Sequence, residues 1–170
     1  RFLLDGAASG RLSCREPNLQ NVPRPDTPEG KLIRDCFAPP PGWVLVQADY
    51  SQLELRVAAA LSGDQAMGEA FKSGEDFHMK TAKMISQVAW GITEDQVEKK
   101  HRTAAKAVNF GLLYGMADEG LAANIGCTPR EAKKVREAVL GRFSNLARWI
   151  AAQLSEARRS GYSWTILPDG

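Results

Sequence analysis

From Asp64 onward the chain has helical character almost throughout, and this feature constrains the fold more than any other. A strong helix start follows at Thr128-Pro129-Arg130-Glu131, which supplies a cap, a proline at the first position and an acid at the third. Ser144 is predicted to cap a last helix, whose apolar face carries Leu146, Trp149, Ile150, Leu154 and Ala157. Glycines or polar breaks separate the other predicted helices, near 64–72, 76–89, 94–115 and 117–125.

The first third of the chain has a different pattern. Residues 1–42 show little helical periodicity and many glycines and prolines, which predict extended segments and turns. Trp43-Val44-Leu45-Val46 is a β-branched and aromatic run that follows a proline turn, so a short buried strand is predicted there. Ser51-Gln52-Leu53-Glu54 matches a capping box, and a helix is predicted from there to Gly63. The expected order is strand, tight junction and helix, with Asp49 at the junction.

The expected fold class is therefore α+β and mainly helical, with short strands that lead into a helical region. Tyr162-Ser163-Trp164-Thr165-Ile166 alternates like a further strand. A length of 170 residues allows one domain, or two small ones that share a core. The chain begins at Arg1 and stops at Gly170 directly after this strand, so we expect it to be a piece of a longer protein.

Composition excludes several classes of protein. With 44% hydrophobic and 25% charged residues, the chain has the balance of a globular protein. No apolar stretch approaches the roughly 20 residues that a membrane-spanning helix needs. The 3 cysteines are far apart, which argues against a zinc cluster and suggests a reducing compartment. A net charge of +2 does not by itself indicate a nucleic-acid-binding protein.

The segment from Lys99 to Gly115 predicts a helix with two opposite faces. At about 100° per residue, one sector of about 120° contains two cations followed by two rings. Those residues are Arg102, Lys106, Phe110 and Tyr114, while Ala104, Val108, Gly111 and Leu112 fall on the side that would face a core. Such cations suit phosphates and such rings suit a sugar or base. A solvated cationic face, with the rings packed into a neighbouring element, explains the same spacing.

Other candidates have two interpretations each. Asp49 is well placed to hold a divalent metal, or to be a structural aspartate at a helix N-terminus. Glu54 fits the capping partner of Ser51, and His78 fits an ordinary histidine near a helix start. Turn or exposed positions explain Arg11, Asn18, Gln20 and Asn21 equally well.

Two long motifs resemble the polymerase domain of family A DNA polymerases, the DNA polymerase I type. Asp49-Tyr50-Ser51-Gln52-Leu53-Glu54-Leu55-Arg56 resembles the first catalytic motif of that family. The residues from Arg102 to Gly115 resemble the second motif, the helix that closes over the incoming nucleotide. Gly10-Arg11-Leu12-Ser13 and Pro17-Asn18-Leu19-Gln20-Asn21 resemble the stretch before the first motif, so the resemblance spans nearly the whole chain.

This resemblance implies a domain organisation and an activity. Residues 1–63 would form a partial palm with the first catalytic motif, and residues 64–170 a fingers subdomain with the nucleotide-binding helix at about 94–115. The implied reaction is template-directed DNA synthesis, in which a primer 3′-hydroxyl attacks the α-phosphate of a deoxynucleoside triphosphate at two Mg²⁺ ions. The family's second metal-binding aspartate, in a His-Asp-Glu turn, has no match here. We therefore expect a fragment that is inactive alone.

The resemblance also implies roles for single residues. Asp49 would bind both metal ions, with the backbone carbonyl of Tyr50 at one of them. Arg102 and Lys106, with His78, would hold the triphosphate and offset the charge of the leaving pyrophosphate, so Asp49, Arg102 and Lys106 are the expected catalytic residues. Further roles are implied for three residues: Phe110 against the deoxyribose and base, Tyr114 on the template side, and Glu54 under the sugar. The implied contacts to primer or template come from Arg11, Asn18, Gln20, Asn21 and Gln52.

Two departures and two rival functions accompany this interpretation. Thr103 stands where many members have a second arginine, and the arginine-rich continuation usual after the last helix is missing, which suggests a phage-like branch. A single-subunit RNA polymerase is the nearest rival, and Phe110 and Glu54 argue against it. A non-catalytic template-binding relative is the other rival. The expected partners are primer–template DNA and deoxynucleoside triphosphates, without a membrane, for a monomer in the cytoplasm of a bacterial or phage-infected cell.

Overall fold

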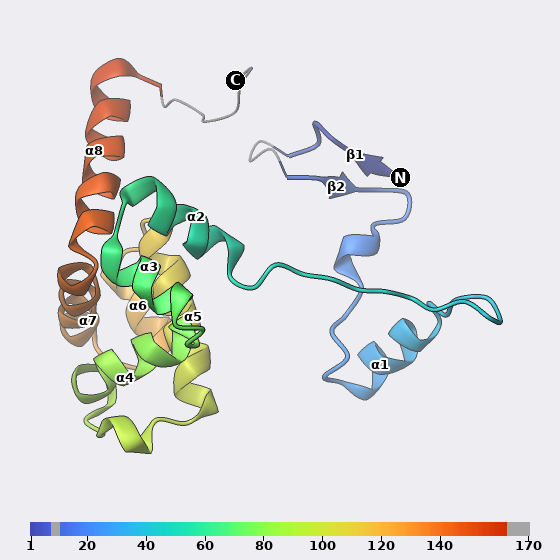
Figure 1. Cartoon of the computed structure of the whole chain (residues 1–170), viewed down its shortest axis with the longest axis horizontal. Coiled ribbons are helices and arrows are strands. Elements are labelled where there is room, and N and C mark those ends of the chain that lie inside the picture. Colours follow the sequence, from blue (N-terminus) through green and yellow to red (C-terminus); the bar gives the residue numbers. More distant parts are fainter. Residues whose placement is uncertain (8–10, 163–170) are drawn as a thin grey trace. The chain divides into compact units, whose positions relative to one another are not determined.

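The computed structural model describes residues 1–7 and 11–162 of the chain (Figure 1). The chain divides into two compact units, Arg1–Asp49 and Tyr50–Gly170, and each is described separately. These units divide after Asp49, before the helix that follows it, whereas the resemblance implies a palm–fingers division after Gly63. The assignment of either unit to a palm or fingers subdomain stays a prediction.

The first unit contains a small sheet and short helices. Strand β1 (Phe2–Leu3) pairs antiparallel with β2 (Ser13–Cys14), and the turn of 3-10 helix η1 (Leu19–Asn21) follows. Helix α1 (Pro28–Asp35) was not expected, so the prediction of extended segments over 1–42 is wrong at this point. The helix forms because Thr27 accepts a hydrogen bond from the Gly30 N–H and Pro28 occupies the first position.

The predicted strand from Trp43 to Val46 is absent. These residues have no regular secondary structure, and the exposed fractions of Val44 and Val46 are 82% and 83%. A strand needs a neighbour that completes its hydrogen bonds, and the sheet described in the structure contains β1 and β2 only. β-Propensity alone therefore did not decide the conformation. Of the other predicted strand, residues 163–166 lie outside the part of the chain that the structure describes.

The second unit is helical over its described length. Six helices follow the expected segments: α2 (Leu53–Ser62), α3 (Gln65–Lys72), α4 (Phe77–Trp90), α6 (Asp118–Ile125), α7 (Pro129–Arg142) and α8 (Ser144–Ser160). The segment predicted at 94–115 is two elements, the 3-10 turn η2 (Glu94–Gln96) and helix α5 (Lys99–Leu113). The mainly helical α+β fold class is thus confirmed. No helix in the described residues is both long enough and apolar enough to cross a membrane.

The three predicted helix starts have different outcomes. The capping box at Thr128 is confirmed, since the Thr128 N–H donates to Glu131 Oε2 at 2.8 Å. The box at Ser51 is wrong, because Gln52 precedes α2 in the left-handed region (φ 55°) and no side chain caps the helix. Ser144 is the first helical residue of α8, and Phe143 holds the cap position instead.

The core of the second unit lies where α4, α5, α6 and α7 pack against one another (Figure 1). Phe77, at the start of α4, is the largest side chain that is almost fully buried, and its ring stacks on Phe71 at 4.9 Å and on Phe143 at 5.3 Å. Helix α5 contributes Val108 and Leu112, with exposed fractions of 0% and 5%. This packing determines which face of α5 is turned toward the core.

Candidate functional site

Helix α5 carries the candidate site on the face opposite the core. Val108, Gly111 and Leu112 are buried, as the periodicity predicted, and Ala104 is half-buried against the core. On the other face Lys106 and Tyr114 are exposed, while Arg102 and Phe110 are half-buried. This second face, with Arg102, Lys106, Phe110 and Tyr114, is named the ligand face. The helical spacing also places Leu113 on it, but Leu113 packs against the core, as the half-buried Phe110 does in part. The amphipathic arrangement expected from the sequence is therefore confirmed.

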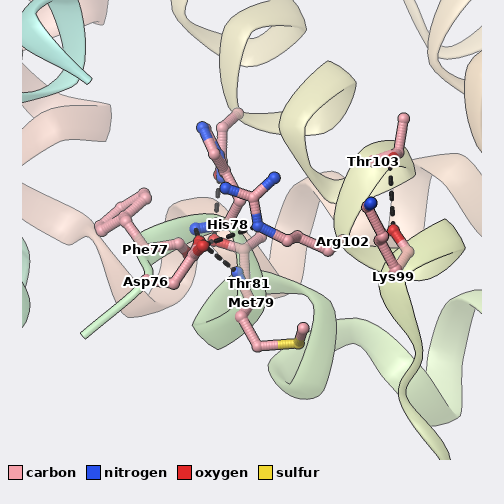
Figure 2. Close-up of polar contacts among 9 residues, drawn as sticks. Asp76, Phe77, His78, Met79, Thr81, Lys99, Arg102 and Thr103 are labelled. Atoms are coloured by element: carbon pink, nitrogen blue, oxygen red, sulfur yellow. Dashed lines mark hydrogen bonds and ion pairs between the residues drawn. The ribbon is translucent and has the colours of Figure 1, made fainter. Parts of the chain in front are cut away.

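A carboxylate on the neighbouring helix holds the first cation of this face. Arg102 Nε donates to Asp76 Oδ2 at 2.6 Å (Figure 2). The other oxygen of Asp76 caps α4, because Oδ1 accepts from the N–H groups of His78 and Met79 at 3.0 Å. Partial burial raises the pKa of Asp76, but the hydrogen bonds from Arg102 and Met79 outweigh it and hold this pKa below its ordinary value. Asp76 is therefore an anion that ties the start of α4 to α5.

His78 lies in the first turn of α4 and is almost fully buried, with 2% exposure. Its Nδ1 is 3.0 Å from Asn109 Nδ2, and Asn109 Oδ1 accepts from the Thr81 hydroxyl at 3.1 Å. Burial lowers the pKa of His78 to about 4, with further lowering by the charges of Arg102 and Lys106 against an opposing effect of Asp76. The imidazole is consequently neutral near pH 7 and offers a hydrogen bond rather than a charge.

Two further rings extend the site along α5. The ring of Phe110 lies 5.9 Å from that of His78, with a tilt of 46°, and 6.3 Å from that of Tyr114, with a tilt of 12°. Tyr114 is 64% exposed, so its ring is open to a ligand. The structure thus brings the buried His78 close to two cations and two rings of α5, and the roles implied for these residues stay predictions.

The turn after α5 is held by residues that sequence reasoning did not single out. The Met116 N–H donates to the Gly111 carbonyl at 2.7 Å, and Gly115 adopts a φ of 73° that favours glycine. Arg136 of α7 donates to Asp118 Oδ1 at 2.6 Å and also to the Met116 carbonyl. These contacts fix the end of the helix beside Tyr114.

The remaining candidates lie around the boundary between the units or in the first unit. Asp49 and Tyr50 are exposed and outside regular secondary structure. Gln52 precedes α2, and its Oε1 is buried without a hydrogen-bond partner, while Glu54 is half-buried in the first turn of α2. Their implied roles stay predictions.

In the first unit, Arg11, Asn18, Gln20 and Asn21 are all exposed. Asn18 Oδ1 accepts from the Gln20 N–H at 3.1 Å, and Gln20 Nε2 donates to the Leu12 carbonyl at 3.0 Å. The turn interpretation therefore describes Asn18 and Gln20 correctly, and their contact with DNA stays a prediction.

A metal centre was expected at Asp49. Within residues 1–7 and 11–162, no group of three or more His, Cys, Asp or Glu side chains is arranged to hold a metal ion. The Asp49 carboxylate and the Tyr50 carbonyl are nevertheless the oxygen ligands that Mg²⁺ prefers, and Mg²⁺ sites often use one or two carboxylates together with substrate phosphates. The residues present thus fit part of a magnesium site.

Known proteins resemble this chain over nearly its whole length. DNA polymerase I, thermostable, from Thermus filiformis is 44% identical over 167 residues, which are 98% of this chain and 19% of that protein. DNA polymerase I from Geobacillus stearothermophilus is 43% identical over 160 residues, which are 94% of this chain and 18% of that protein. The chain therefore spans about a fifth of the length of these relatives.

A solved structure and a family model agree with these relatives. The POL domain of Pol1 from M. smegmatis, in complex with DNA primer-template and dNTP, is 38% identical with a TM-score of 0.80, over 97% of this chain and 28% of that one. The model of DNA polymerase family A matches residues 1–168. Together with the motifs at Asp49 and Arg102, this match shows that the chain belongs to DNA polymerase family A.

Proposed function

We propose that this chain forms the nucleotide-handling part of a DNA-directed DNA polymerase. The observation that carries the proposal is the ligand face of α5, where Arg102 and Lys106 precede the rings of Phe110 and Tyr114, with the neutral His78 of α4 beside Phe110. A triphosphate followed by a sugar and a base has the matching order of chemical groups. The M. smegmatis neighbour, solved with DNA primer-template and dNTP, supports deoxynucleoside triphosphates and DNA as the partners.

The residues of the ligand face have separate roles in this proposal. Arg102 and Lys106 stabilise the negative charge that develops on the pyrophosphate as the primer 3′-hydroxyl displaces it. His78 donates a hydrogen bond to a phosphate oxygen without adding a charge. Phe110 packs on the deoxyribose and base, and Tyr114 occupies the template side of the insertion site.

Asp49 and the Tyr50 carbonyl are proposed to supply oxygen ligands for Mg²⁺. When bound, the metal makes the primer hydroxyl a better nucleophile and neutralises charge on the phosphates. Glu54 excludes a 2′-hydroxyl from the sugar site. Contacts with primer and template are proposed for the polar residues near the first motif: Arg11, Asn18, Gln20, Asn21 and Gln52.

Phe110 and Glu54 favour deoxynucleotides over ribonucleotides, which distinguishes this proposal from a single-subunit RNA polymerase. The relatives from Thermus and Geobacillus are bacterial proteins, which supports a bacterial cytoplasm as the place of action. A monomeric state and the phage alternative stay predictions.

The test is a chimera in which this chain replaces the matching segment of a family A relative. The chimera is expected to extend a primer with deoxynucleotides and to discriminate against ribonucleotides. Asp49→Asn should abolish extension while leaving primer–template affinity nearly unchanged, because only the metal ligand is lost. Asp26→Asn, at another exposed carboxylate of the first unit, is the matched control and should extend normally. Extension by the Asp49 variant would contradict the metal role, and equal use of ribonucleotides would favour an RNA polymerase.

A further inference from the structure

Arg102 uses only part of its hydrogen-bonding capacity within the protein. A guanidinium group has donors on Nε and on both terminal nitrogens. Nε donates to Asp76, whereas neither terminal nitrogen donates a hydrogen bond to any residue that the structure describes. The Arg102 side chain is 34% exposed, so these donors are accessible to a ligand. Arg102 is therefore anchored at one edge and available at the other.

Asp76 is itself fixed from a second direction. Its Oδ1 accepts from the N–H groups of His78 and Met79, so the carboxylate cannot rotate without opening the first turn of α4 (Figure 2). The orientation of this carboxylate consequently determines the direction of the Arg102 side chain. The same carboxylate sets the main chain of His78, which carries another donor of the site.

We propose that Asp76 is a positioning residue for the polyphosphate of a nucleoside triphosphate. It holds Arg102 by Nε and thereby directs the terminal nitrogens of Arg102 to the phosphates beside His78 and Lys106. This inference rests on the proposed function. A free arginine side chain loses conformational entropy when a ligand immobilises it, and the ion pair with Asp76 removes part of that cost before the ligand arrives.

The choice of an acid at this position supports the proposal. Capping α4 requires one acceptor oxygen, and asparagine or serine caps a helix about as well as aspartate. Only the contact with Arg102 needs the second, charged oxygen. A carboxylate close to a phosphate site also repels the ligand, so a purely electrostatic role of Asp76 would oppose binding. Positioning and electrostatics therefore predict opposite effects of removing the charge.

The experiment measures tripolyphosphate binding to the full chain by calorimetry, without metal and at about 0.15 M salt, where the Debye length is about 8 Å. Asp76→Asn keeps the cap but loses the charged partner of Arg102, and its affinity should fall about tenfold. Glu75→Gln is the matched control. Glu75 directly precedes Asp76 in the sequence and forms an ion pair of 2.6 Å with Lys80, but it does not contact Arg102. Its affinity should stay within about twofold of the unsubstituted chain.

Two further measurements separate positioning from a structural effect. In an Arg102→Lys background, Asp76→Asn should change the affinity less than twofold, because a lysine has no Nε to anchor. The NMR signal of the Arg102 Nε–H should be protected from exchange in the unsubstituted chain and in E75Q, and exchange quickly in D76N. Asp76→Ser, which keeps a shorter cap, gives the same comparison if D76N does not fold.

The outcomes distinguish this inference from the proposed function. Tripolyphosphate binding that is unchanged or tighter in D76N would overturn the positioning role and leave the phosphate site intact. A fast-exchanging Arg102 Nε–H in the unsubstituted chain would overturn it as well. No binding of tripolyphosphate to the unsubstituted chain, with Arg102 Nε–H protected, would contradict the proposed function instead.

Discussion

At the scale of single residues, His78 combines burial with a titratable ring. It is 2% exposed and is contacted through Nδ1 by Asn109. The charged groups that act on it are Asp76 from its own helix and Arg102 and Lys106 from α5. Helix α7 and the turn η2 also pack against α4, and neither provides a described charge that shifts the pKa of His78. Its protonation is therefore set by burial and by the ligand face itself.

Protonation of His78 should make the fold less stable in acid. The pKa is 6.5 for an ordinary histidine and about 4 in the folded chain, so the unfolded chain takes up the proton first as the pH falls. Stability is thus fully present above pH 6.5 and decreases toward pH 4, by about 2 kcal/mol between pH 7 and pH 5. Urea unfolding at both pH values gives the free energy of unfolding of the unsubstituted chain and of His78→Gln. The contribution of His78 is the difference between the losses that the two proteins show from pH 7 to pH 5.

His101→Gln is the control for this measurement, because it replaces the other histidine, which is half-buried and caps α5 through Nδ1. Because His78 is unchanged in this variant, the free energy of unfolding should still fall between pH 7 and pH 5. If His78→Gln lost as much unfolding free energy between pH 7 and pH 5 as the unsubstituted chain, His78 would not be the group responsible.

Residue positions in the site were predictable only where a local repeat exists. Arg102, Lys106 and Phe110 share a helical face, and the period of the α-helix places them without knowledge of the fold. Asp76 and Asn109 had no such signal, because Asp76 is 26 positions from Arg102 and Asn109 is 31 positions from His78. Their partners depend on the packing of α4 against α5, which no local pattern encodes.

At the scale of elements, Asp64 joins the starts of two helices that are distant in sequence. Its Oδ1 caps α3 by accepting from the Met67 N–H at 3.1 Å. Its Oδ2 accepts from the N–H groups of Asn145 and Leu146 at 3.1 and 3.2 Å, at the start of α8. Asp64 is 4% exposed, so water cannot replace these bonds easily. The carboxylate compensates for the missing side-chain cap of α8.

Asp64→Ala should therefore lower the free energy of unfolding by about 2–4 kcal/mol, because several main-chain donors lose their acceptor in a buried place. Urea denaturation monitored by circular dichroism measures the change. Thr128→Ala removes a single exposed cap at α7 and should cost only about 1 kcal/mol. Equal losses for the two variants would contradict the double role of Asp64.

Helix positions were predicted well where periodicity and caps agree, as at Thr128. Helix α1 was missed although Thr27-Pro28-Glu29 is the same kind of start, because the surrounding prolines and glycines dominated the pattern. At Ser51 the motif was present but Gln52 adopts a left-handed conformation, so the serine does not reach the helix. A cap motif shows that a helix can begin there, and the backbone before it decides whether the cap forms.

At the scale of the whole molecule, the main core belongs to one unit. The buried cluster runs from Leu55 to Leu146 and lies within Tyr50–Gly170. His78, Arg102, Lys106, Phe110 and Tyr114 lie in the same unit. This unit should therefore be able to fold and to bind phosphate by itself.

Residues 50–170 expressed alone should unfold cooperatively in urea and bind tripolyphosphate within about twofold of the full chain. Circular dichroism and calorimetry test the two parts of this prediction. Residues 1–49, which contribute nothing to the cluster, serve as the comparison and should show no cooperative transition. A non-cooperative transition of the 50–170 segment would show that the first unit is required for the core.

The compact units divide at a different point from the subdomains that the resemblance implies. The resemblance places a palm–fingers division after Gly63, whereas the compact units divide after Asp49, because α2 packs against α3 and α8. Such contacts join Leu53–Ser62 to Ser144–Ser160, which are far apart in sequence, so no local pattern predicts them.

The exposed segment from Trp43 to Val46, which has no regular secondary structure, bears on the association of this chain in solution. Apart from the bond of the Trp43 N–H to the Pro40 carbonyl, no main-chain hydrogen bond in the described residues involves it. A run of exposed, β-prone residues with unpaired main-chain groups is a template onto which a second chain adds a strand. Oligomers that form at high protein concentration would then arise from strand pairing through this segment. The oligomeric state of the chain should therefore be measured in dilute solution.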